Sequence, residues 1–167
     1  MAVVDAPRPA GEARQGPAFV AFLAASLAVA ALGGLATAGD VDGWYASADK
    51  PSWTPPDAVF GPVWTVLYIV MAVAAWLVWR EGGWARQRRP LVLYATQLAL
   101  NLAWTPVFFA AERLALALAV IVALDLVLAA TVVAFWRVRT VAGALLVPYL
   151  AWCLFATSLN AGFLLAV

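Results

Sequence analysis

Large aromatic and amide side chains recur at helical spacing along three apolar stretches of this sequence. Indole rings stack on flat apolar molecules and a few amides orient them, so such faces together predict a largely apolar binding pocket. Taken singly, each side chain is explained as well by helix packing or by a hydrogen bond between helices. The three faces consist of Phe60, Trp64, Tyr68 and Met71; of Gln97, Asn101, Trp104 and Phe108; and of Trp152, Ala156, Asn160 and Phe163.

The residue types exclude most acid–base and nucleophilic catalysis. The chain has no histidine and a single cysteine, Cys153, which removes Ser-His and Cys-His pairs, histidine metal sites and an intramolecular disulfide. Asp125 is the one acid in its apolar stretch, and a neutral, hydrogen-bonded carboxyl explains it as well as a pocket does. We therefore expect no metal site and no catalytic residue of the hydrolytic kind.

A segment rich in proline and tryptophan, residues 40–56, separates the first two apolar stretches, and we call it the aromatic loop. Proline fixes φ and lacks an N–H group, so a stiff extended loop is expected, with Asp57 capping the next helix. Large aromatic rings on such a loop suit a lid over an apolar pocket, although an aromatic belt at the level of lipid headgroups explains them too. The residues assigned to the lid are Trp44, Lys50, Pro51, Trp53, Pro55 and Pro56.

The composition indicates an all-α integral membrane protein. Of the 167 residues, 66% are hydrophobic and 11% are charged, and the mean hydropathy is +0.92. The net charge of +1 provides no basic surface for nucleic acid. Residues 1–17 are expected to form a disordered tail before a membrane domain at 18–167. Its five transmembrane helices are expected at about 18–38, 57–79, 90–110, 114–136 and 141–166.

The first apolar stretch has a second interpretation, as a signal peptide. Arg8 and Arg14 precede it, and it ends in the small residues at 36–38. Its apolar core, residues 18–35, is longer than the roughly 7–15 residues of such peptides, which favours a retained helix.

The basic residues divide unevenly between the two faces that five spans define. Lys50 and Arg113 fall on one face, and every other basic residue falls on the opposite face. The positive-inside rule therefore places the N-terminus in the cytoplasm of a bacterial cell membrane. The aromatic loop and the C-terminus are expected on the other side, and a bacterial outer membrane stays the alternative location.

Two motifs carry a family resemblance: Lys-Pro-x-Trp-x-Pro-Pro in the aromatic loop and Pro-Tyr-x-x-Trp-x-x-Phe-Ala in the last apolar stretch. With the residues around them, they resemble a bacterial member of the tryptophan-rich sensory protein/translocator protein family. This family is also called TspO/MBR or the peripheral-type benzodiazepine receptor family. The resemblance covers roughly residues 18–163. Its matching residues are Trp44-Tyr45, Lys50 to Pro56, Phe60, Trp64, Leu67-Tyr68, Gln97, Asn101, Trp104, Phe108-Phe109, Asp125, Leu145 to Trp152, Phe155-Ala156 and Leu159-Asn160.

The resemblance implies a five-helix bundle, often a homodimer in the lipid bilayer, with a pocket beneath the aromatic loop. It implies a receptor or sensor that binds porphyrins, such as protoporphyrin IX or haem, and similar flat apolar molecules, with a role in tetrapyrrole transport or regulation. The porphyrin is expected as a ligand and not as an obligatory cofactor. Without histidine, stacking and shape must hold it. The residues expected to bind it are Tyr45, Phe60, Trp64, Tyr68, Gln97, Asn101, Trp104, Trp152, Ala156 and Asn160.

Two other functions stay open at this point. Some family members are proposed to degrade porphyrin in a light- and oxygen-dependent reaction, and Trp64 and Trp152 match the tryptophans implicated there. The other alternative is a structural or regulatory membrane partner without a native small ligand, for which Ala115, Ala119 and Ala123 offer a small-residue face. Animal members carry a cholesterol motif after the fifth helix, and its tyrosine and basic residue are missing here, so cholesterol transport through that motif is not expected.

Overall fold

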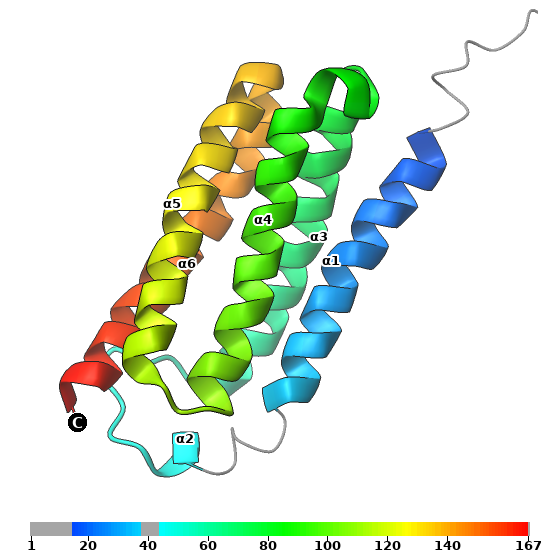
Figure 1. Cartoon of the computed structure of the whole chain (residues 1–167). Helices are drawn as coiled ribbons and strands as arrows, with labels where there is room; N and C mark the ends of the chain where they lie inside the picture. The colour runs from blue at the N-terminus through cyan, green and yellow to red at the C-terminus, as the bar shows by residue number, and fades with distance from the viewer. Residues whose placement is uncertain (1–14, 38–43, 167) are drawn as a thin grey trace, which may run out of the picture.

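The computed structural model describes residues 15–37 and 44–166, and they form a bundle of long helices (Figure 1). Residues 1–14 of the tail expected at 1–17, and the beginning of the aromatic loop, lie outside the described residues, whereas residues 15–17 belong to the first helix. Within the described part, five helices are long and apolar enough to cross a membrane, which confirms the predicted all-α membrane fold. The long helices are α1 (Gln15–Thr37), α3 (Phe60–Trp79), α4 (Gly83–Phe109), α5 (Leu114–Val138) and α6 (Thr140–Ala166).

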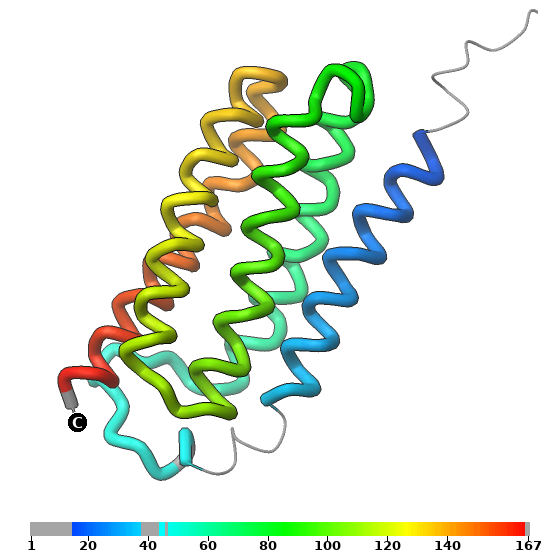
Figure 2. Tube along the Cα trace, viewed as in Figure 1, coloured from blue at the N-terminus to red at the C-terminus, as the bar shows by residue number. Residues whose placement is uncertain are grey.

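The helices pack around a core shared by α3, α4, α5 and α6. Helix α1 packs mainly against α3 and α4 at the edge of the bundle (Figure 2). It has the smallest buried share of the five. The fully buried side chains include Met71 of α3, Ile121 and Phe135 of α5 and Tyr149 of α6. Apolar residues cover these helices on all sides, because one side faces the core and the other faces the hydrocarbon of the bilayer.

The aromatic loop contains one short helix, and a second helical turn follows it. Helix α2 (Trp44–Ser47) begins its described part, and a 3₁₀ turn (Asp57–Val59) leads directly into α3. Asp57 does not cap this helix as expected. Pro56 occupies the capping position, and its carbonyl closes the turn by accepting from the Val59 N–H at 2.9 Å. The carboxylate of Asp57 is therefore left to pair with Lys50 in the loop.

Helix α4 begins at Gly83 and not at Pro90, where the sequence placed its start. Gly82 and Gly83 have φ values of 131° and 61°, which reverse the chain directly after α3. Gln87 then departs from helical geometry, with φ −110° and ψ 24°, so a short first segment precedes the main helix. Pro90 lies in the first turn after this kink. Backbone N–H groups in a first turn have no partner within the helix, so the N–H group that proline lacks costs no hydrogen bond.

One end of the bundle gathers α2, the described residues of the aromatic loop that follow it, the turn between α4 and α5 and the C-terminal end of α6 (Figure 1). Lys50 and Arg113 belong to this end. The opposite end carries Arg80 and Arg139 in the connections between helices and Arg86 in the short first segment of α4. This arrangement positions the loop over the helix ends, and the assignment of either end to the cytoplasm stays a prediction.

Candidate ligand pocket

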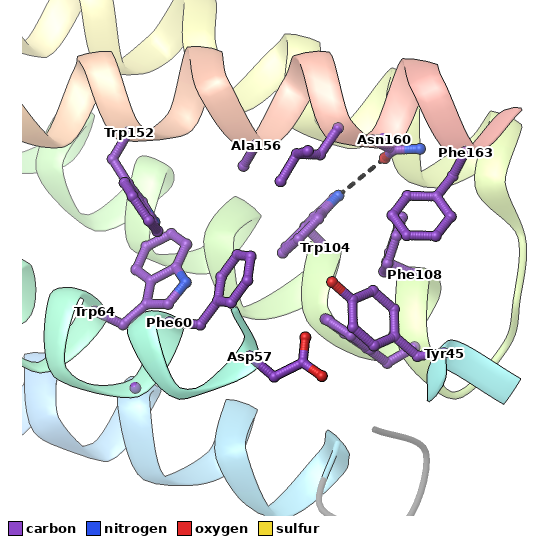
Figure 3. Close-up of a pocket in the computed structure, with 13 residues that line it drawn as sticks. Tyr45, Asp57, Phe60, Trp64, Trp104, Phe108, Trp152, Ala156, Asn160 and Phe163 are labelled. Carbon is purple, nitrogen blue, oxygen red and sulfur yellow. Dashed lines mark hydrogen bonds between the residues drawn. The ribbon is translucent and has the colours of Figure 1, made fainter. Parts of the chain in front are cut away.

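A cavity of about 270 Å³ lies at the aromatic-loop end of the bundle, between α3, α4 and α6 and next to α2 (Figure 3). Trp64 and Trp152 form one end of it, and Tyr45 and Phe163 form the other end, near α2. The wall is mostly aromatic, as in sites for flat apolar ligands. The lining residues are Tyr45, Asp57, Phe60, Gly61, Trp64, Trp104, Phe108, Phe109, Trp152, Ala156, Leu159, Asn160 and Phe163.

Two indoles meet edge to face at the inner end of the cavity. The ring centroids of Trp64 and Trp152 are 6.5 Å apart at an interplanar angle of 87°. Phe60 packs edge-on against Trp152 at 5.8 Å. The Nε1 atom of Trp152 is buried and has no hydrogen-bond partner in the described structure. Because an unpartnered buried donor costs about 1–3 kcal/mol, a bound molecule that places an acceptor beside this nitrogen would be favoured.

An amide on α6 fixes the opposite wall. Trp104 donates from Nε1 to Oδ1 of Asn160 at 3.2 Å, the contact drawn in Figure 3. Asn160 donates from Nδ2 to the carbonyl of Leu114 at 3.0 Å. Both polar atoms of the Asn160 side chain are thus engaged with protein groups, so its main effect on the cavity is to hold Trp104 in place.

The aromatic loop is anchored to the bundle by Trp44. Its Nε1 donates to the carbonyl of Phe109 at 2.6 Å, and its ring packs edge-on against Phe163 at 6.2 Å. Farther along the loop, Pro51 lies against α6 at Gly162, where an added Cβ would come within 2.5 Å of the proline ring. The loop therefore depends on a glycine at this position of α6 for its close approach.

Lys50 and Tyr45 form the polar edge of the cavity together with Asp57. The ammonium of Lys50 is 3.3 Å from Oδ2 of Asp57 and 4.2 Å from the ring centroid of Tyr45. Burial, together with the negative charge of Asp57, raises the pKa of Tyr45 to about 12. The hydroxyl of Tyr45 is therefore neutral at physiological pH.

The other assigned lid residues differ in their exposure. Trp53 is 53% exposed, and its ring edge would lie 3.1 Å from a Cβ at Gly162. Pro55 is half-buried and Pro56 is exposed. Trp44, Lys50, Pro51 and Trp53 are thus the lid residues that make the described contacts with the cavity wall or with α6.

Three of the expected binding residues do not line this cavity, because they belong to a buried hydrogen-bonded chain deeper in the bundle. The Tyr68 hydroxyl donates to Oδ1 of Asn101 at 2.5 Å, and Nδ2 of Asn101 donates to the Tyr149 hydroxyl at 3.0 Å. Tyr149 donates to Oε1 of Gln97 at 2.9 Å, and Nε2 of Gln97 lies 3.7 Å from the sulfur of Met71. Gln97 is completely buried in this chain and lines neither this cavity nor the second one described below, so the structure does not bring it together with the lining residues, and its contact with a ligand stays a prediction.

A second cavity of about 240 Å³ lies between α1, α3 and α4. Tyr68 and Asn101 line it, together with Gly33 and Gly34 of α1. Gly61, Trp64, Trp104 and Phe109 line both cavities. The side chains of Trp64 and Trp104 therefore form a wall between two neighbouring spaces. Asp125 lines neither cavity, and its Oδ2 accepts a 2.7 Å hydrogen bond from Thr157.

The sequence-based assignment missed several lining residues. Phe108 and Phe163 continue the aromatic faces of α4 and α6 toward the loop, so helical spacing contained the signal for both. Phe109 and Leu159 lie outside those faces, and Asp57 was assigned to a helix cap. Their place in the wall follows from the way the loop folds onto the helix ends. In contrast, Tyr45, Phe60, Trp64, Trp104, Trp152, Ala156 and Asn160 are brought together as lining residues.

Comparisons with known proteins point to one family. The TspO/MBR family model matches residues 21–165 of this chain. A translocator protein from Homo sapiens is 48% identical over 119 residues, which cover 70% of each chain. A tryptophan-rich sensory protein from Cereibacter sphaeroides is 46% identical over 142 residues, covering 85% of this chain and 86% of the relative. A tryptophan-rich protein TspO from Archaeoglobus fulgidus is 39% identical over 141 residues, covering 84% and 91%. With five apolar helices and an aromatic cavity beneath the loop, the chain is an integral membrane protein that belongs to the TspO/MBR family.

Proposed function

We propose that this protein binds porphyrins, such as protoporphyrin IX or haem, in the aromatic cavity and acts as a membrane sensor or transporter of tetrapyrroles. Family membership supports the sensor or transporter role. The observation that carries porphyrin binding is the aromatic wall of the cavity, with the indoles of Trp64 and Trp152 at one end. Indoles offer flat, apolar surfaces on which a macrocycle stacks.

The size of the cavity sets a condition on this binding. Ligand sites usually enclose about 300–1,000 Å³, and this cavity has about 270 Å³. A porphyrin therefore requires either a movement of the wall residue Trp64 toward the second cavity or an edge that stays at the mouth under the loop. Both adjustments involve the aromatic loop or side chains, and neither requires the helices to separate.

A dark titration of the purified full-length protein with protoporphyrin IX, followed by tryptophan fluorescence, tests the proposal. Saturable quenching is expected for the wild type, and weaker binding is expected for the double variant Trp64→Phe/Trp152→Phe. A matched control is Trp84→Phe/Trp136→Phe, which removes two tryptophans that are exposed and outside the cavity. Linear quenching that is identical in all three proteins would mean partitioning into detergent and would leave a structural or regulatory role as the better function.

A second candidate function is light- and oxygen-dependent porphyrin degradation. The contact between Trp64 and Trp152 in the cavity wall favours it, because both indoles would lie against the ligand. The ligand itself would supply the photochemistry. Illumination of the saturated complex, with product analysis by chromatography, separates the two functions. The same loss of porphyrin in the wild type and in the double variant supports simple bleaching, whereas defined products that form with the wild type and are missing with the double variant support an enzyme.

A further inference from the structure

Lys50 lies at the mouth of the cavity, in contact with two residues of its wall. Its ammonium is 3.3 Å and 3.4 Å from the two carboxylate oxygens of Asp57, and 4.2 Å from the ring centroid of Tyr45. Both of these partners line the cavity, whereas Lys50 itself extends from the aromatic loop. It is the one lysine of the chain. The loop thus places its lysine beside two residues of the cavity wall.

The contacts that hold Lys50 are weak enough to be exchanged. Charge-assisted hydrogen bonds between an ammonium and a carboxylate usually measure about 2.7–2.9 Å, and both distances here are longer. The side chains of Lys50 and Asp57 are 25% and 50% exposed, so water competes for both charges. A lysine side chain is flexible and carries three donors, which allows it to accept a new anionic partner without a change in the loop backbone.

The distribution of polarity in the cavity gives a bound acid one favourable orientation. Asp57 is the one charged side chain among the lining residues, and the end formed by Trp64 and Trp152 offers an unpartnered indole N–H group but no positive charge. A carboxylate placed at that inner end would lose its hydration without gaining a counter-ion. An acid with a flat apolar body avoids this cost when its body lies between the aromatic rings and its carboxylate stays at the mouth beside Lys50.

We propose that Lys50 is the subsite for a carboxylate of the ligand, and that Asp57 yields its contact with Lys50 when such a ligand binds. The preferred ligand class is therefore a flat apolar acid, and a neutral ester of the same body is a poorer ligand. This inference rests on the proposed function and refines it, because it concerns the same cavity. In the absence of a ligand, the carboxylate of Asp57 pairs with the ammonium of Lys50 and takes the place of the ligand's carboxylate.

The experiment compares protoporphyrin IX with its dimethyl ester, which keeps the macrocycle and removes the acids. Dissociation constants are measured in the dark with the full-length protein in neutral detergent. The wild type is expected to prefer the acid, and Lys50→Met is expected to weaken binding of the acid about fivefold while changing binding of the ester by less than about twofold.

Two further variants and a salt series test the same subsite. Lys50→Arg should retain the preference for the acid. Asp57→Asn should strengthen binding of the acid, because it removes the competing carboxylate. The preference should also decrease as salt is added, since exposed charges are screened.

Arg113→Met is the matched control, because it removes a positive charge at the same end of the bundle from a residue outside the cavity wall. It is expected to leave the ratio of the two affinities unchanged. Saturable binding of both ligands with no preference, or an equal loss for both in Lys50→Met, would overturn the subsite and leave porphyrin binding standing. Absence of saturable binding for both ligands would overturn the proposed function and the subsite with it.

Discussion

The indole of Trp104 on α4 donates a hydrogen bond of 3.2 Å to the side chain of Asn160 on α6, within the wall of the cavity. Asn160 also donates to the carbonyl of Leu114 at the start of α5, at 3.0 Å. One amide therefore joins three helices at the point where the ligand is proposed to bind. Because Asn160 is completely buried, its replacement leaves the groups that it bonds without a partner at a place that water cannot reach.

Asn160→Leu is expected to lower the free energy of unfolding by about 1–2 kcal/mol, because the Trp104 N–H group loses its partner. Porphyrin affinity should fall as well, since Trp104 becomes free to turn. Thermal unfolding in detergent and the dark titration measure the two effects. Ser158→Ala is the control, because Ser158 is exposed and donates to the carbonyl of Phe155 in its own helix. Equal stability of the two variants would contradict the bridging role of Asn160.

Gly162→Ala is expected to displace the aromatic loop from α6. The new Cβ would lie 2.5 Å from Pro51, which is closer than carbon atoms pack, so the proline must move. Alanine stabilises a helix interior by about 1 kcal/mol relative to glycine, so a net loss of thermal stability would show that the loop contact is the larger effect. Ligand dissociation should become faster, as measured by stopped-flow fluorescence. Gly16→Ala has open space around its Cβ and provides the comparison for helix propensity alone; if both variants behave alike, Gly162 does not control the loop.

Gln97→Leu separates the stability of the bundle from ligand binding. Gln97 accepts from Tyr149 and lies outside the cavity wall, so its replacement should destabilise the protein by about 0.6–2 kcal/mol, within the range for hydrogen bonds between membrane helices. The affinity for porphyrin should stay within about twofold of the wild type, since no lining residue changes. A large loss of affinity with unchanged stability would return Gln97 to the binding site.

The titration of Tyr45 provides a pH-dependent test. Its pKa is about 12 in the folded protein, against an ordinary value of 10.0, so the folded state holds the proton more tightly than the unfolded state does. The contribution of this group to stability is complete below pH 10.0 and is lost as the pH rises through about 12. Ultraviolet absorbance of the phenolate, with Tyr45→Phe as the reference, follows the titration. Asp57→Asn should lower the pKa, because it removes a negative charge near the hydroxyl; an increase would contradict that cause.

The number and the approximate places of the long helices could be predicted from the sequence. Each apolar stretch is long enough to cross the bilayer, and as a helix it makes its backbone hydrogen bonds within its own segment. Helical spacing likewise placed Trp64, Trp104 and Trp152 on the faces that turn inward. The start of α4 was not predicted, because a proline that opens one helical segment does not reveal the short segment before the kink at Gln87.

Spacing along a helix determines which face a residue occupies, and it says nothing about how far along the axis the cavity extends. On α4, Gln97 and Trp104 lie on the same inward face. The side chain of Gln97 nevertheless belongs to a buried hydrogen-bonded chain, whereas the side chain of Trp104 lies in the cavity wall. The sequence by itself therefore determined the membrane class, the helices and their aromatic faces, since these follow from local hydrophobicity and periodicity. Only the tertiary structure decided that Trp44 bonds to Phe109 of α4, that Pro51 packs against Gly162 of α6 and that Lys50 lies beside the wall residue Tyr45, because these contacts depend on where the loop folds back onto the bundle.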